Sequence, residues 1–365
     1  MAPLSGSVTA FFLFEVGDLI DLAEVRRRIT ATAAAPLALK SPAPAYVQYQ
    51  QAPIVIEGAA LGVPEVEGFR ARLKAFDYGV ISVSLSRALP DTWPGLLADG
   101  LTVYDSPALA VAAEGLCRTL VTQLGPAVAA PRSAFLSEDY VVFSVVSGVP
   151  LADGDDAEGL LARHGAELAQ LLRGERAPLS PQERDEVLRH RISYFSHDLV
   201  IRTWTGAFVY DTEAGAQAAL EILEFANSQL LEFRYYDSLL DTKLAHIYAQ
   251  LQVSGWRQSW FMRRYTRAAQ EVHSLFIDVN ELTDKTENAL TIAGDVYAAR
   301  LFALTAARLG LDQWKGNVRE KLKTLDDIYR FAVEHTAMAR GEFLELTVVL
   351  ILVLELGFFF AGIMD

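Results

Sequence analysis

Two acidic side chains occupy positions that the sequence predicts to be shielded from water, and both could do chemistry there. Glu355 lies in the apolar run of residues 346–364, and Asp237 lies at an apolar position of a helical repeat. A carboxyl group inside a membrane helix costs about 2.5–3.5 kcal/mol on insertion scales and normally faces protein or water. Glu355 therefore indicates either a helix–helix contact or pore lining in an oligomer, or a shallow, tilted anchor whose glutamate reaches an interface.

The apolar run itself is just long enough to cross a bilayer, which takes about 20 mainly apolar residues. A helix that is apolar all round is buried in a large protein or set in lipid. Arg330 and Arg340 precede the run, and no basic residue follows it. The apolar run predicts a tail-anchored protein, and the positive-inside tendency predicts that its body lies in the cytoplasm and its C-terminus outside. The site residues predicted for this transmembrane helix are Glu345, Glu355 and Gly357.

Asp237 belongs to a seam of residues whose steps alternate between four and three. A seam held for three or more heptads is typical of coiled coils. Two further seams cover residues 261–296 and 318–346. A carboxylate buried at a seam needs a partner, so Asp237 indicates either a contact that fixes helix register or a ligand site. The first seam consists of Ala219, Leu223, Ala226, Leu230, Phe233, Asp237, Leu240, Leu244, Ile247 and Leu251.

The segment around Asp237 supplies further candidates for helix-seam or oligomer contacts, namely Asn227, Glu232, Arg234, Tyr235 and Tyr236. Residues 227–237 resemble a hallmark of the "required for meiotic nuclear division" family, which carries a shared domain of unknown function. Other similar segments extend the resemblance over roughly residues 8–365; they include residues 76–82, 138–142 and 198–204. The resemblance implies an α/β region, long helices and a C-terminal membrane segment, in a family with no established enzymatic activity. The N-terminus lacks the features of a transit peptide, so a mitochondrial role is not implied. The resemblance then implies a prokaryotic plasma membrane as the location.

The first half of the chain alternates between strand and helix patterns. Strands are predicted at residues 8–16, 46–56, 76–85, 140–146, 192–201 and 204–210, and helices at 19–31, 106–124 and 157–172. This order predicts an α+β fold that is ferredoxin-like in parts, followed by long coiled-coil-like helices and one C-terminal transmembrane helix. The predicted parts are a cytoplasmic α/β domain (1–211), a helical stalk (212–343) and a transmembrane helix (344–365).

Composition argues against several classes of function. The net charge is −14 and no basic stretch is present, so direct nucleic-acid binding is not expected. Cys117 is the sole cysteine, and its apolar neighbours predict a plain buried thiol. His190 and His197 are seven residues apart, and they either ligate a metal or have surface and packing roles. Phosphate-loop, zinc-protease and serine-hydrolase motifs are absent from the sequence, so catalytic, cofactor-binding and metal-binding residues are not predicted.

Together these patterns predict a non-enzymatic, homo-oligomeric scaffold. Its long helices would hold the α/β domain off the membrane and organise an unidentified protein partner, with the lipid bilayer as a second partner. The alternative is an oligomeric ion channel or transporter of CorA-like architecture with Glu355 in the membrane helix, although the Gly-Met-Asn signature and a second membrane helix are absent. An enzyme acting through the α/β domain has only its fold class in its favour.

Overall fold

The structure, a computed structural model, divides the chain into two compact units. They are Met1–Tyr235 with Leu282–Lys315, and Tyr236–Glu281 with Gly316–Asp365. The residues that the structure describes are 4–32, 51–58, 66, 68–104, 106–146, 156–252, 277, 296–328, 330, 347–349 and 351–352.

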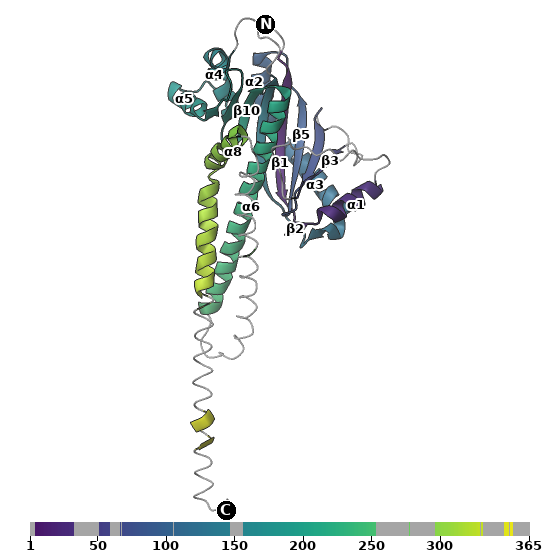
Figure 1. Cartoon of the computed structure of the whole chain (residues 1–365), viewed down its shortest axis with the longest axis vertical. Coiled ribbons are helices and arrows are strands. Elements are labelled where there is room, and N and C mark those ends of the chain that lie inside the picture. The colour runs from purple at the N-terminus through teal and green to yellow at the C-terminus, as the bar shows by residue number, and fades with distance from the viewer. Residues whose placement is uncertain are drawn as a thin grey trace, which may run out of the picture. The chain divides into compact units, whose positions relative to one another are not determined.

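The first unit is built on an eight-stranded mixed sheet with the order β3-β4-β5-β1-β7-β10-β9-β8 (Figure 1). Strand β1 pairs antiparallel with both β5 and β7, and β10 pairs parallel with β7. A second sheet pairs β2 (Leu19–Ile20) with β6 (Val128–Ala129). The strands of the large sheet are β1 (Gly6–Glu15), β3 (Ile54–Glu57), β4 (Arg70–Ala75), β5 (Val80–Ala88), β7 (Leu136–Val146), β8 (Arg191–Ile192), β9 (Leu199–Arg202) and β10 (Gly206–Asp211).

One face of the sheet, the apolar face, carries the main core. Alternate residues of paired strands point to the same side, as Val8, Phe143 and Phe208 do across β1, β7 and β10. Helices α2, α3 and α4 pack on this side, and Cys117 of α3 is fully buried there, as predicted. Burial raises the pKa of its thiol. The helices of this unit that precede α6 are α1 (Leu22–Thr32), α2 (Trp93–Tyr104), α3 (Pro107–Leu124), the 3₁₀ helix η2 (Gly125–Ala127), α4 (Ala157–Arg173) and α5 (Pro181–Arg189).

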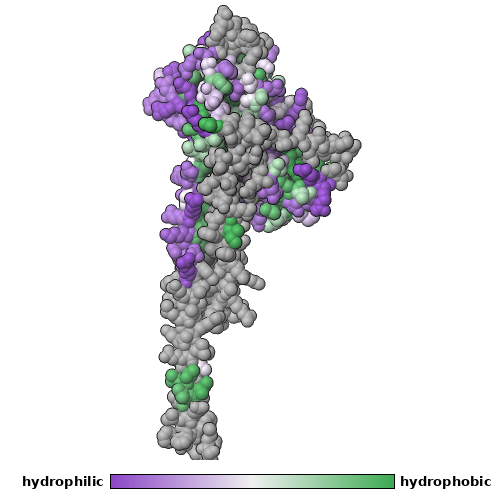
Figure 2. Space-filling model, viewed as in Figure 1, coloured by the Kyte–Doolittle hydropathy of each residue, from purple (hydrophilic) through white to green (hydrophobic). Residues whose placement is uncertain are grey.

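The opposite face, the polar face, is contacted by the first half of α6 (Glu213–Gln252), which lies against the sheet in Figure 1. Helix α8 (Val296–Arg308) follows later in the chain, and residues 311–328 are also helical. The polar-face residues with buried or partly buried polar side chains include Thr9, Glu15, Lys74, Ser82, Glu138, Tyr140, Ser144 and Arg202. Hydrophilic side chains also gather on the molecular surface, over α4 and α5 (Figure 2).

The predicted mixed domain followed by helices is confirmed, but the ferredoxin-like part is corrected. Strands β8, β9, β10 and β4 widen the sheet beyond the four strands of a ferredoxin-like unit. The strand predicted at residues 192–201 is two short strands, β8 and β9, because a turn at residues 193–198 interrupts them. The described part of the chain also contains α2 and β4, which the sequence patterns did not predict.

The predicted C-terminal transmembrane helix is contradicted. Among the residues that the structure describes, no helix combines the length and the apolar character that crossing a membrane requires. An apolar sequence predicts that its side chains are shielded from water, but it does not show whether lipid or protein shields them. The tail anchor and the plasma-membrane location depended on this helix and are contradicted with it. Glu345, Glu355 and Gly357 lie outside the described residues.

Candidate functional site

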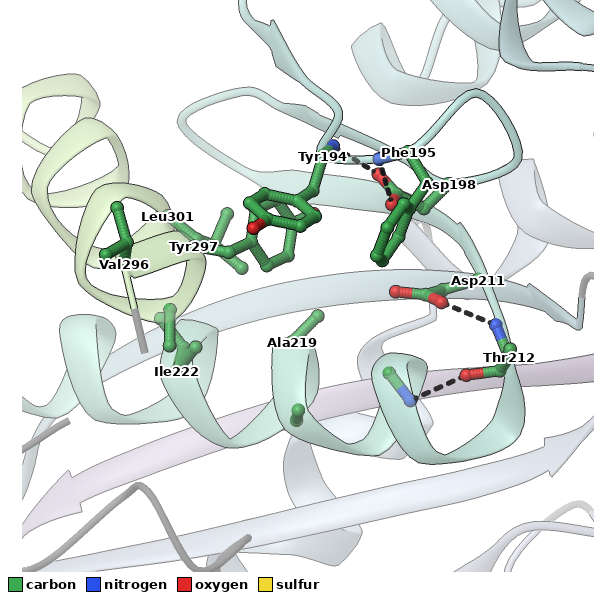
Figure 3. Close-up of a pocket in the computed structure, with 13 residues that line it drawn as sticks. Tyr194, Phe195, Asp198, Asp211, Thr212, Ala219, Ile222, Val296, Tyr297 and Leu301 are labelled. Atoms are coloured by element: carbon green, nitrogen blue, oxygen red, sulfur yellow. Dashed lines mark hydrogen bonds between the residues drawn. The ribbon is translucent and has the colours of Figure 1, made fainter. Parts of the chain in front are cut away.

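A pocket of about 570 Å³ lies in the first unit, at the N-terminus of α6 (Figure 3). Three segments line it: the turn between β8 and β9, the β10–α6 junction with the first turns of α6, and the start of α8. Figure 3 shows the turn that carries Tyr194 and Phe195 facing the first turn of α6 across the pocket. The pocket therefore brings together residues that precede β9, residues that follow β10 and residues of α8.

Asp198 holds the β8–β9 turn in shape. Its buried carboxylate accepts hydrogen bonds from the backbone N–H groups of Tyr194 and Phe195, both at 2.7 Å. These two residues are left 61% and 59% exposed, so their side chains are accessible to a ligand. The Tyr194 ring makes edge contacts with Phe195 and with Tyr297 of α8, at centroid distances of 4.8 and 5.7 Å.

Asp211 and Thr212 begin α6. The Thr212 hydroxyl oxygen accepts a hydrogen bond from the Gly215 N–H at 3.1 Å, and Asp211 Oδ1 accepts one from the Thr212 N–H at 2.6 Å. A Cβ atom at Gly215 would lie 2.2 Å from Asp211 Oδ2, so glycine lets the carboxylate lie against the helix. Burial raises the pKa of Asp211 and the Asp198 carboxylate adds to the rise, while the Thr212 hydrogen bonds and His197 oppose it.

The two histidines considered as metal ligands have other contacts. The His197 ring stacks on Phe195 at 5.3 Å, and His190 Nε2 lies 3.1 Å from a carboxylate oxygen of Glu186. Within the described ranges, no three acidic, histidine or cysteine side chains are grouped so that they could hold a metal ion.

The predicted site residues on the first half of α6 have partners within the same unit. Asn227 is buried and donates from Nδ2 to the Leu223 carbonyl of its own helix at 2.8 Å. Arg234 pairs with Glu138 of β7, and its guanidinium lies over the Trp314 ring. The Arg234 contacts hold the helix to the rest of the unit.

Glu232 and Tyr235 face an acidic neighbour on the sheet. Burial raises the pKa of Glu15 well above its ordinary value, and the neighbouring Glu232 adds to the rise, with Arg132 in partial opposition. Arg132 also lies over the Tyr235 ring at 4.5 Å from its centroid. The motif therefore brings a pair of buried carboxyl groups to the polar face.

In the second unit, Tyr236 is buried and Asp237 has the partner that its seam position requires. Lys321 Nζ lies 2.7 Å from Asp237 Oδ1 and 2.6 Å from Asp241 Oδ1. Partial burial acts to lower the pKa of Lys321, but the bonds to both aspartates outweigh it and raise the pKa.

The sequence patterns did not identify Lys74, Asp198 or Asp211 as site residues. Lys74 is buried between Glu221 and Glu224 of α6, with Nζ 2.6 Å from Glu221 Oε2. An available signal was the cap pattern Asp211-Thr212 ahead of Gly215 and an apolar helix, which marks a helix start. No comparable local signal exists for Lys74, because its partners lie 147 and 150 residues away.

The part of the pocket formed by the β8–β9 turn and the β10–α6 junction falls within a segment that matches a known family, whereas its α8 residues lie outside that segment. Residues 5–217 match the family described as the N-terminal domain of uncharacterized protein MJ0711, and this match covers more than half of the chain. The chain belongs to this family. Uncharacterized protein MJ0711 of Methanocaldococcus jannaschii is 24% identical over 201 residues, which are 55% of this chain and 61% of that protein. The chain thus spans about three fifths of the length of this relative. No solved structure matches.

These findings confirm the predicted membership of a family with a domain of unknown function at this coarser level. The match ends at residue 217, ahead of the motif at residues 227–237.

Proposed function

We propose that this chain is a non-enzymatic scaffold that forms homo-oligomers through its helices and organises a protein partner. The observation that carries the proposal is the attachment of α6. This helix has 40 residues, so it extends over about 60 Å at a rise of about 1.5 Å per residue. Buried charged contacts, rather than apolar packing alone, hold its first half to the sheet.

Such contacts favour one orientation of the helix. Lys74 must lie between Glu221 and Glu224 because each of these three groups is almost fully buried and would otherwise lose its counter-charge. A helix held in this way suits the presentation of a fixed surface to a second molecule. On the later turns of α6, Tyr248 exposes 49% of its surface and is our candidate for a contact between copies.

The polar groups of the pocket support the non-enzymatic part of the proposal. Asp198 bonds to the backbone of its own turn, and Thr212 bonds to the first turn of α6. Their contacts are those of residues that shape a binding surface. Substrate turnover that disappears in Asp211→Asn would contradict this part.

We also assign the chain, within the same proposal, to the "required for meiotic nuclear division" family. The resemblance of residues 227–237 extends beyond the matched segment into α6, where Asn227, Glu232 and Phe233 are buried. A solved structure of a member of that family in which this motif lies away from the sheet would contradict the assignment.

Sedimentation velocity on the full chain tests the oligomer. We expect a dimer or larger species across the micromolar range, and a weaker self-association in Tyr248→Lys. The matched control is Val111→Lys, which changes another exposed apolar residue, on α3. A chain that remains monomeric at every concentration contradicts the proposal, and so does equal self-association in the two variants.

A further inference from the structure

We propose that the pocket at the N-terminus of α6 binds a primary alkylammonium group, either of a lysine side chain or of a free polyamine. The proposal goes beyond homo-oligomeric scaffolding and does not depend on it. It stands on the charge, the aromatic rings and the apolar floor of the pocket.

The charge of the pocket is negative. Asp198 and Asp211 line it, and among the described residues that line it there is no lysine or arginine. The N-terminus of a helix supplies only about half a positive charge, which two carboxylates exceed. Asp198 is stabilised by two backbone N–H groups, whereas the hydrogen bonds of Asp211 come from Thr212. Burial and the Asp198 carboxylate raise the pKa of Asp211, and the Thr212 hydrogen bonds and His197 oppose the rise.

The rings around the pocket suit a cation. Ammonium groups are attracted to aromatic faces within about 6 Å of the ring centroid. Tyr194 and Phe195 expose well over half of their surfaces, and Tyr297 meets Tyr194 from α8. These rings come from two separate segments and approach the same space as Asp211 (Figure 3).

The floor of the pocket explains why the cation should carry a carbon chain. Ala219 and Ile222 of α6 and Leu301 of α8 line it, and they offer apolar contact to methylene groups. The volume of about 570 Å³ lies within the range of small-molecule sites. A bare metal ion would leave this apolar surface unused.

Isothermal titration calorimetry on the full chain tests the proposal with n-pentylamine, n-pentanol and n-pentanoate. We expect n-pentylamine to bind about tenfold or more tightly than the neutral alcohol, and n-pentanoate not to bind. Equal binding of amine and alcohol would show an apolar pocket only and would overturn the proposal. Absence of amine binding would overturn it as well.

Two variants locate the binding. Asp211→Asn should weaken n-pentylamine binding about tenfold or more, since it removes the charge at nearly constant shape. Phe195→Leu should weaken it about two- to fivefold through the lost ring, and its high exposure makes misfolding an implausible cause. Asp91→Asn, an exposed carboxylate outside the pocket, is the matched control and should bind as the original chain does. Unchanged binding in Asp211→Asn would refute the assignment.

The source of the ammonium group is decided by two further probes, spermidine and an acetylated, amidated Gly-Lys-Gly peptide. Tighter binding of the peptide points to a lysine of a partner protein, and tighter binding of spermidine points to a free polyamine. If neither binds, the proposal fails. Sedimentation results for Tyr248→Lys remain separate from all of these outcomes, so failure here does not imply failure of the scaffold.

Discussion

One face of the eight-stranded sheet packs Val8, Ile81 and Phe143 beneath α2, α3 and α4. The other face carries the buried charged side chains of Glu15, Lys74 and Arg202. Residues 81 and 82 of β5, adjacent in the chain, belong to these opposite faces. The apolar face gains free energy from each buried methylene group, at about 0.8 kcal/mol. The polar face instead removes charges from water, and each must find a counter-charge to offset that cost.

The difference separates two tasks within one sheet. Apolar packing tolerates many arrangements of similar volume. Paired charges accept few, because a misplaced helix leaves a buried ion alone. We infer that the apolar face supplies most of the stability and that the polar face fixes how α6 is placed. Four predictions test this division, from the largest expected change in the free energy of unfolding to the smallest.

Lys74→Met should be the most damaging. It leaves Glu221 and Glu224 buried without their counter-charge, and we expect the free energy of unfolding to fall by about 3–5 kcal/mol in urea titrations. The control is Arg72→Met, which breaks an exposed pair with Glu57 on the same sheet and should cost about 0–1 kcal/mol.

A triple variant sharpens the same comparison. Replacing Lys74 by Met together with Glu221→Leu and Glu224→Leu should restore most of the loss, because buried ion pairs are often exchangeable for apolar groups. Recovery would indicate that the ions determine placement rather than stability. Equal losses in Lys74→Met and Arg72→Met would contradict the burial of this charge.

Arg202→Met should act in the opposite direction. Arg202 is 3% exposed, and its Nε and Nη1 groups have no hydrogen-bond partner among the described residues. Burial lowers the pKa of its guanidinium, and Arg308 contributes to the decrease. Removing this charge should raise the free energy of unfolding by about 1–4 kcal/mol. Arg202→Lys keeps the charge and should give no such gain; a loss in Arg202→Met would show that the charge is compensated.

The two faces also differ in how far the sequence could predict them. Local periodicity found β1, β5 and β7 and the helices α1, α3 and α4, because alternation and helical repeats are properties of neighbouring residues. It missed α2, whose Gly95 and Gly100 weaken a helical pattern, yet Gly100 is needed where Leu171 and Phe143 approach closely. It also read residues 192–201 as one strand, since nothing local announces that the Asp198 carboxylate closes a turn.

The polar face and the pocket were harder to predict for a physical reason. Lys74 and its two glutamates are far apart in sequence, so no short stretch of sequence contains both the lysine and the carboxylates that pair with it. The seam residues Ala226, Leu230 and Phe233 were correctly identified as apolar positions, and they are buried within this chain. The spacing of apolar residues shows which side of a helix is shielded from water, but not which surface covers that side.

The pH dependence of stability should reveal the Glu15–Glu232 pair. The pKa of Glu15 in the folded state lies well above its ordinary value of 4.5, so the folded state holds this proton more tightly than the unfolded state. Its contribution to stability is therefore complete below about pH 4.5 and is lost as the pH rises through the folded-state pKa.

Glu15→Gln cannot ionise and should escape that loss. Its unfolding free energy, relative to that of the original chain, should grow with pH above about 4.5 at no more than about 1.4 kcal/mol per pH unit. Urea titrations from pH 4 to pH 8 check this. The two proteins should differ least at the acidic end, and a constant difference over the whole range would contradict the raised pKa.

The smallest and most direct test compares Ser82 with its neighbour Ile81. Both are fully buried on β5, but Ile81 contributes to the apolar core and the Ser82 hydroxyl has no hydrogen-bond partner among the residues that the structure describes. Ile81→Val should cost about 0.5–1.5 kcal/mol through the lost methylene group. Ser82→Ala removes an unsatisfied hydroxyl and should raise the free energy of unfolding by roughly 1 kcal/mol. Adjacent substitutions with opposite signs would show that the difference between the faces holds residue by residue, whereas a loss in Ser82→Ala would mean that this hydroxyl has a partner in solution.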